Sequence, residues 1–140
     1  MLSNRRTRRI EWSECDPAGI VYYPRYYEMF DSSTTRLFEK ALGMSAAQFF
    51  KHYDALGYPL VNSSARYLVP IWFSDDVEIE TTVAEFRRSS FEMQHRLFKD
   101  GELAVEGFET RVWVVRHPDD PARMKSQPIP QEIIARFNNA

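Results

Sequence analysis

Hydrophobic spacing in the first third of the chain predicts one long helix. From Tyr23 onward, bulky apolar residues recur at intervals of three and four, the period of an α-helix with a buried face. Pro24 suits a first helical position, because the N–H that proline lacks is not needed there. Gly43 is a suitable end. The residues of the pattern are Tyr23, Tyr26, Tyr27, Phe30, Leu37, Phe38 and Ala41.

Alternating patterns later in the chain predict strands. In residues 75–86 and 90–98 every second side chain is mostly apolar, and "KDG" at 99–101 is a hairpin turn signal. Further strands are expected at residues 7–14, 59–70 and 103–116, with a bulge or bend at Gly107. Residues 44–59 are expected to be helical or irregular, and a short helix is expected over 130–137. The predicted inward faces are Val77, Ile79, Thr81 and Val83, and Phe91, Met93, His95 and Leu97.

This order of elements predicts an α+β fold. One strand, one long helix and four more strands fit a curved antiparallel sheet of five strands wrapped around a central helix. The middle of the helix, "DSSTTR" at 31–36, is small and polar rather than broadly charged. We therefore expect both faces of the helix to be covered, which suggests a second subunit.

Composition excludes several classes of protein. A chain of 140 residues with 44% hydrophobic and 14% aromatic content is expected to form one domain over 1–140 with a real core. The formal charge of −2 gives no global basic field for nucleic acid. A single cysteine makes no internal disulfide, and neither a secretory signal nor a membrane span is recognisable. We expect a cytoplasmic protein.

The stretch "ECDPAGIVYYPRYYEMFD" at 14–31 raises the question of function. Asp16 before Pro-Ala-Gly is typical of a turn in which the aspartate accepts backbone N–H bonds. It also precedes a helix start, where free N–H groups and the helix dipole favour negative charge, and Gly19 permits close approach of a ligand. A carboxylate beside such an N-terminus suits acyl transfer, either as nucleophile or as base for water.

The segment "DPAGIVYYPRYYEMFD", together with "DDVEIET" and "FRRSSF" downstream, resembles the hotdog-fold acyl-CoA thioesterases of the 4-hydroxybenzoyl-CoA thioesterase type. The resemblance spans nearly the whole chain. It implies the hotdog fold, which is a five-stranded antiparallel sheet wrapped around a long helix. It also implies a homodimer with a continuous sheet across the interface, often paired into a homotetramer, and an acyl-CoA substrate.

The resemblance also implies roles for individual residues. Asp16 falls on the catalytic carboxylate, and the backbone N–H of Tyr23 falls on the group that polarises the thioester carbonyl. The related Tol-Pal-associated branch has a histidine at the position of Tyr23. Arg87 and Arg88 fall on positions that meet the CoA phosphates, with Ser89 in place of a third basic residue. Guanidinium groups suit phosphate, although two arginines at a strand end are also typical of a solvated edge.

Other polar side chains leave alternatives open. The acyl pocket is expected around Tyr22, Tyr23, Tyr26 and Tyr27. Asp31 lies one helical turn beyond Tyr27 and would either bind a hydroxyl on an aromatic acyl group or, as we prefer, cap or solvate the helix. Residues 62–64, "NSS", would face either the acyl pocket or a partner subunit.

Cysteine and histidine chemistry has little support. Cys15 beside Asp16 is a poor nucleophile, since a neighbouring carboxylate disfavours the thiolate. His95 is expected to be packed in the core, and the three histidines lack metal-binding spacing. No metal or redox cofactor is expected. The arginines of "RRTRR" at 5–9 more often mark an edge segment than a nucleic-acid site.

The sequence favours an acyl-CoA thioesterase. The alternatives are a non-catalytic acyl-CoA binding module and a hotdog hydratase or dehydratase, which generally needs a histidine beside the acid. The acyl group is not determined, nor is the choice between CoA and acyl-carrier-protein thioesters.

Overall fold

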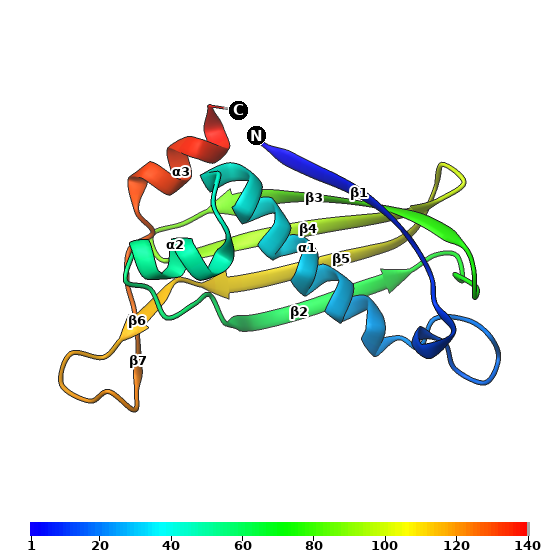
Figure 1. Ribbon diagram of the computed structural model, residues 1–140, viewed down its shortest axis with the longest axis horizontal. Coiled ribbons are helices and arrows are strands. Elements are labelled where there is room, and N and C mark those ends of the chain that lie inside the picture. Colours follow the sequence, from blue (N-terminus) through cyan, green and yellow to red (C-terminus); the bar gives the residue numbers. More distant parts are fainter. Residues whose placement is uncertain (140) are drawn as a thin grey trace.

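The computed structural model describes residues 1–139 and contains one main sheet with a long helix across one face (Figure 1). Within these residues five antiparallel strands form the sheet in the order β1-β3-β4-β5-β2. The predicted α+β fold is therefore confirmed. The strands are β1 (Ser3–Arg9), β2 (Leu60–Tyr67), β3 (Asp76–Phe86), β4 (Ser90–Lys99) and β5 (Glu102–Val112).

The long helix α1 (Pro24–Leu42) begins and ends at the predicted residues. Pro24 occupies its first turn, and Gly43 ends it with a φ of 66° while its N–H donates to the carbonyl of Glu39 at 2.9 Å. The helix buries one face against the sheet. The buried residues are Tyr26, Met29, Phe30, Ser33, Thr34, Leu37, Phe38, Ala41 and Leu42.

Gly107 has a different role from the one predicted. Pairing runs without a shift through Gly107, which lies opposite His95 on one side and Ala65 on the other, so the predicted bulge is absent. A Cβ at this position would lie 2.4 Å from the ring of Phe30. The glycine is needed because α1 approaches the sheet closely here.

The predicted strand faces are confirmed in β3 and β4, where all eight residues predicted to face inward are buried. The turn between β4 and β5 is also as predicted. Asp100 and Gly101 both have positive φ, 51° and 76°, as a two-residue hairpin turn requires.

The first strand predicted over 7–14 is confirmed only over residues 7–9, and its bounds are wrong. Strand β1 ends at Arg9, and a short 3-10 helix, η1 (Trp12–Glu14), follows. The carboxylate of Glu14 accepts the N–H of Glu11 at 2.9 Å and the guanidinium of Arg8 at 2.6 Å, which folds the chain back on itself. These contacts depend on Glu14, so alternation of polarity alone does not predict them.

The last predicted strand is divided. Strand β5 ends at Val112, and the N–H of Trp113 donates to the carbonyl of Ser89 at 2.7 Å beside the start of β4. It then forms a separate hairpin of β6 (Val114–Arg116) and β7 (Met124–Ser126). The remaining helices are α2 (Ala46–His52) and the expected α3 (Gln131–Asn138). No helix described in residues 1–139 is long and apolar enough to cross a membrane.

Candidate functional site

The turn that holds Asp16 is fixed by its own backbone. Oδ1 of Asp16 accepts the N–H of Ala18 at 2.9 Å, and its carbonyl accepts the N–H of Gly19 at 2.9 Å. Gly19 has a φ of 87°, which a side chain would strain. The turn predicted from Asp-Pro-Ala-Gly is therefore confirmed. The half-buried carboxylate makes one hydrogen bond within residues 1–139, so Oδ2 is available to a ligand.

Backbone pairing brings this turn to the start of α1. Cys15 and Val21 form an antiparallel bridge, and the N–H of Tyr22 donates to the carbonyl of Glu14 at 2.9 Å. The chain therefore doubles back over residues 15–21 and enters the helix directly. Within residues 1–139 the N–H of Tyr23, at the N-cap, has no protein acceptor. A free N–H at the positive end of a helix is suited to polarising a carbonyl oxygen.

An apolar pocket of about 280 Å³, the helix-start pocket, lies beside this N–H. Burial, and then a hydrogen bond with Tyr27, raise the pKa of Tyr67 to about 12, and burial likewise raises the pKa of Tyr26. Both rings are neutral at physiological pH and give the pocket an uncharged wall. Tyr27 was also expected to line this pocket but does not; its ring packs edge-on against Phe30. The lining residues are Ile20, Val21, Tyr23, Tyr26, Tyr67, Leu68, Val69, Pro70 and Ile71.

Asp31 forms an ion pair that the sequence did not predict. Its carboxylate accepts Nη2 of Arg111 at 2.7 Å, although its side chain is 64% exposed. The two residues line a second pocket of about 380 Å³, the Arg111 pocket. Thr35 and Tyr58 line it too, and their hydroxyls are 2.9 Å apart. Asp31 is exposed to solvent, as the preferred interpretation expected, but its carboxylate binds Arg111 rather than capping the helix.

A buried polar cluster lies behind this ion pair, between α1 and the sheet. Oε1 of Glu109 accepts Nε2 of His95 at 2.9 Å and the hydroxyl of Thr34 at 2.7 Å, and Oε2 accepts Nη2 of Arg111 at 2.9 Å. His95 is fully buried and stacks on Phe30, as predicted for a packed histidine. Burial alone would raise the pKa of Glu109, but His95 and Arg111 outweigh it and lower the pKa to about 2.

Sequence reasoning missed Glu109 and Arg111, although a signal was present. Every second position from Gly107 to Trp113 in the last predicted strand is buried, and Glu109 and Arg111 occupy the two middle positions. Charged residues at the inward positions of a strand are rarely buried unless they are paired. The pattern therefore indicated a buried ion pair, but not its partners.

The predicted phosphate ligands lie at the other end of α1. Residues 87–89 form the turn between β3 and β4, which Figure 1 shows beside the C-terminal end of the helix. Since α1 has 19 residues, about 28 Å of helix separates this turn from Asp16. One chain therefore does not bring Asp16 and the arginines together.

The two arginines differ in their contacts. Arg87 donates to Glu85 and Glu92, both at 3.1 Å, so its charge is already satisfied. Within residues 1–139 Arg88 makes no ion pair, and it lines a pocket of about 430 Å³ together with Lys125. The carbonyl of Ser89 accepts the N–H of Trp113 at 2.7 Å, which fixes the backbone of this turn.

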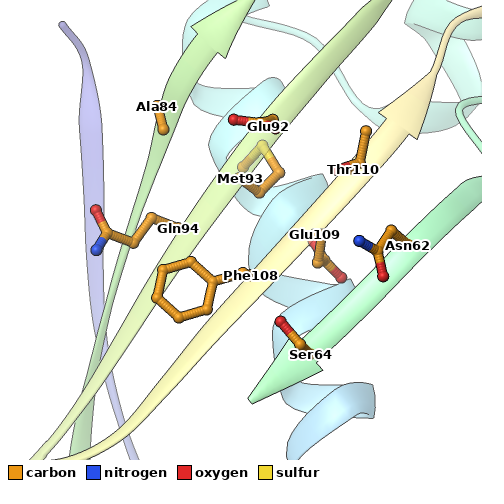
Figure 2. A pocket seen from close by; sticks show the side chains of 9 residues that line it. All are labelled: Asn62, Ser64, Ala84, Glu92, Met93, Gln94, Phe108, Glu109 and Thr110. Carbon is orange, nitrogen blue, oxygen red and sulfur yellow. The ribbon is translucent and has the colours of Figure 1, made fainter. Parts of the chain in front are cut away.

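A further pocket, of about 400 Å³, lies on the sheet face away from α1 (Figure 2). Asn62 and Ser64 line it together with Gln94, Phe108 and Thr110, which alternate with buried residues on β4 and β5. Asn62 and Ser64 therefore do not line the helix-start pocket of their own chain.

Among the described residues, neither the Cys15 thiol nor a cluster of potential metal ligands provides a second candidate site. Burial, and then Glu14 and Asp16, raise the pKa of Cys15, which agrees with the expectation of an unreactive thiol. Within residues 1–139 no three histidine, cysteine or acidic side chains gather in a way that could hold a metal ion.

Comparison with known proteins identifies the family. Residues 10–137 match the model of the thioesterase-like superfamily. The chain belongs to this superfamily. The 4-hydroxybenzoyl-CoA thioesterase of Pseudomonas sp. strain CBS-3 is 30% identical over 132 residues, which are 91% of this chain and 92% of that enzyme. Its solved structure has a TM-score of 0.86 at 29% identity and covers 96% of this chain and 98% of that one.

Two further relatives act on other aromatic thioesters. A solved gentisyl-coenzyme A thioesterase is 28% identical with a TM-score of 0.80, covering 94% of this chain and 99% of that one. A 1,4-dihydroxy-2-naphthoyl-CoA hydrolase of Crocosphaera subtropica is 24% identical over 69% of each chain. The resemblance to hotdog-fold thioesterases is thus confirmed.

Proposed function

We propose that this protein hydrolyses an acyl-CoA thioester to the free acid and CoA at the start of α1. The observation that carries the proposal is the free N–H of Tyr23 at the helix N-terminus, beside a turn whose Asp16 has one unbound carboxylate oxygen. The N–H stabilises negative charge on the carbonyl oxygen, while Asp16 attacks the carbonyl carbon or activates water.

The reaction needs little help beyond these two groups. The leaving group is a thiolate, which departs without strong acid assistance, so no histidine has to stand beside Asp16. His95 is fully buried and bound to Glu109 and Thr81, which argues against the hydratase alternative. The superfamily also contains a solved aspartate-to-asparagine variant of a 4-hydroxybenzoyl CoA thioesterase in complex with 4-hydroxybenzoyl CoA, which fits a carboxylate role.

An aromatic acyl group is the substrate class that these observations support. The helix-start pocket is walled by the rings of Tyr23, Tyr26 and Tyr67, which suit a planar apolar group. Three relatives are named for hydroxylated aromatic acyl groups: 4-hydroxybenzoyl, gentisyl and 1,4-dihydroxy-2-naphthoyl.

A homodimer formed along β2 accounts for the separation of Asp16 from Arg88. Strand β2 is a free edge of the sheet, and large apolar side chains are exposed along and beside it. Antiparallel pairing of β2 with its copy would reverse the second subunit, so that the Arg88 end of one chain approaches the Asp16 end of the other. Arg88 would then bind the CoA phosphates, while Arg87 stays paired with Glu85 and Glu92.

A dimer of dimers, a cytoplasmic location and a single domain over 1–140 stay predictions.

The direct test is thiol release from a panel of acyl-CoA esters, including benzoyl, hydroxybenzoyl, hydroxynaphthoyl, short branched and medium-chain acyl groups. The expected result is turnover of CoA esters, fastest for an aromatic acyl group. A protein that binds these esters in calorimetry but releases no thiol from any of them would be a binding module, and the proposed reaction would be wrong.

A further inference from the structure

The backbone of Glu14 joins the two halves of the proposed reaction site. Its carbonyl accepts the N–H of Tyr22 at 2.9 Å, and Tyr22 directly precedes Tyr23, whose N–H has no acceptor within residues 1–139. In the other direction along the chain, Glu14 lies two residues before Asp16. The position of Glu14 therefore sets where the Asp16 turn lies relative to the first free amide of α1.

The side chain of Glu14 is fixed by contacts on both of its oxygens. Oε1 accepts the N–H of Glu11 at 2.9 Å, and both oxygens accept Nη2 of Arg8 at 2.6 Å. The Glu14 side chain is 16% exposed and that of Arg8 is 27% exposed, against 69% and 67% for the neighbouring pair of Asp76 with Arg9. Solvent therefore screens the Arg8–Glu14 pair much less than its neighbour.

Strand β1 carries a second arginine on the same face, and that arginine holds α1. Arg6 and Arg8 are two residues apart, so their side chains leave the strand on the same side. Nε of Arg6 donates to the hydroxyl of Ser33 at 3.0 Å, and Nη2 donates to the carbonyl of Met29 at 3.1 Å. One strand thus holds the helix through Arg6 and the residue before the turn, Glu14, through Arg8.

The other side of the turn is held by backbone contacts alone. The N–H of Phe73 donates to the carbonyl of Gly19 at 2.9 Å, and the N–H of Val21 donates to the carbonyl of Ile71 at 2.9 Å. These bonds do not depend on the ion pair with β1. Loss of that ion pair should therefore loosen the turn without detaching it.

We propose that Glu14, held by Arg8, is a positioning residue that sets the Asp16 carboxylate against the Tyr23 N–H. The inference rests on the proposed thioesterase function, because these two groups form its reaction site. A carboxylate that attacks or activates water must be aligned with the carbonyl that the N–H polarises, and a displacement of about 1 Å can slow a reaction by about 10²-fold.

The first test is the turnover of variants of the ion pair. Arg8→Met removes the ion pair but keeps a long apolar side chain, and kcat should fall by about tenfold to 10²-fold. Glu14→Ala should lower kcat at least as much. Neither residue lines the helix-start pocket, so KM and the dissociation constant of a non-hydrolysable thioether analogue should stay within about twofold of wild type.

Two further variants show whether the ion pair itself is the cause. Arg8→Lys should retain most of the activity, because a single nitrogen of Arg8 makes both contacts with Glu14 and one ammonium can replace it. Arg9→Met is the matched control, since Arg9 is the next residue of β1 and its ion pair is exposed. It should leave kcat unchanged.

A double-mutant cycle separates positioning from a general loss of structure. In an Asp16→Asn background, Arg8→Met should change the remaining turnover by less than about twofold, because the carboxylate that the ion pair positions is already gone. A general loss of structure would lower turnover by the same factor in both backgrounds. Denaturant unfolding of each variant gives the fraction of folded protein.

Amide hydrogen exchange provides a measurement that needs no substrate. The Tyr22 N–H reports its bond to the Glu14 carbonyl directly. In Arg8→Met and Glu14→Ala its exchange should be at least about tenfold faster relative to the amides of the central strand β4, because the turn opens locally more often. In Arg9→Met the Tyr22 exchange rate should not change.

Three results would overturn the inference. The first is a wild-type kcat in both Arg8→Met and Glu14→Ala. The second is an equal loss of turnover from Arg8→Met with and without Asp16. The third is a kcat of Arg8→Lys as low as that of Arg8→Met.

Failure of the proposed function gives different results. Full turnover in Asp16→Asn, or no thiol release from any ester in the panel, would contradict the reaction itself. Faster Tyr22 exchange in Arg8→Met would still support the link from β1 to the turn, whereas unchanged exchange would remove that link as well.

Discussion

Two carboxylates, those of Asp16 and Glu109, show how the same group serves opposite purposes in this fold. Glu109 accepts hydrogen bonds from three side chains and is almost fully buried. Asp16 accepts one bond from its own turn and keeps an oxygen free. The saturated carboxylate joins α1 to the sheet and has no oxygen free for a substrate, whereas the open one is available for the proposed reaction. The number of donors around a carboxylate, rather than its proximity to a helix, separates the two roles.

Replacing the open carboxylate should have the largest effect on activity. Asp16→Asn keeps an oxygen that accepts the Ala18 N–H, so the turn should survive. Turnover should fall by about 10² to 10⁴, the range for a lost acid–base group. Thiol release and denaturant unfolding are measured together. Unchanged turnover in a folded variant would show that Asp16 is only a turn residue.

Replacing the saturated carboxylate should have the largest effect on stability. Glu109→Gln leaves the buried Arg111 with only the exposed carboxylate of Asp31 as an ion-pair partner, and breaking a buried ion pair costs up to about 3–5 kcal/mol. Urea unfolding gives the free energy. Glu106→Gln is the matched control on the same strand. Its partner Arg66 is exposed, so the expected cost is below about 1 kcal/mol. An equal loss of unfolding free energy in the two variants would show that the buried ion pair contributes no more than the exposed one.

Acid should weaken the Glu109 cluster over a defined pH range. The folded-state pKa of Glu109 is lowered from 4.5 to about 2. A lowered carboxyl pKa contributes stability above the unfolded pKa, and this contribution is lost as the pH falls through the range from 4.5 to about 2. Its size is on the order of 3 kcal/mol. The free energy of unfolding measured against pH should fall less steeply in Glu109→Gln. Parallel curves for the two proteins would contradict this contribution.

The close approach of α1 to this cluster should have the smallest effect of the four. Gly107→Ala places a Cβ against the Phe30 ring, which stacks on His95, and overpacking of this kind costs about 1–3 kcal/mol. The cost should shrink in a Phe30→Leu background. Gly101→Ala, where a Cβ meets nothing within 4 Å, should lose a similar amount in both backgrounds, about 1 kcal/mol from backbone strain. An equal cost of Gly107→Ala in the wild-type and Phe30→Leu backgrounds would show that the contact with Phe30 is not its cause.

Local features of the fold were predictable because their causes are local. Pro24 and Gly43 define the ends of α1, and alternation assigns the buried faces of β3 and β4. Asp16 and Gly19 specify a turn through their own backbone contacts. Where a side chain far along the chain intervened, prediction failed. The pattern predicts a bulge or bend at Gly107, because Phe30, which needs the space, is 77 positions earlier in the sequence.

The site was predictable only in part for the same reason. The motif located Asp16, Tyr23 and the arginine pair, but it could not distinguish Arg87, neutralised by Glu85 and Glu92, from Arg88. The ion pair of Asp31 with Arg111 joins residues 80 positions apart, so a count of nearby charges in the sequence does not find it.

The sequence by itself determined the order of the long helix and the main strands, the faces they bury and the turn that carries Asp16, because periodicity and turn chemistry act over a few residues. Only the tertiary structure decided which charges are neutralised, which are left free, and that the two halves of the proposed site lie at opposite ends of α1. Those properties depend on strand register and on the rotation of the helix against the sheet, and both are set by packing between distant parts of the chain.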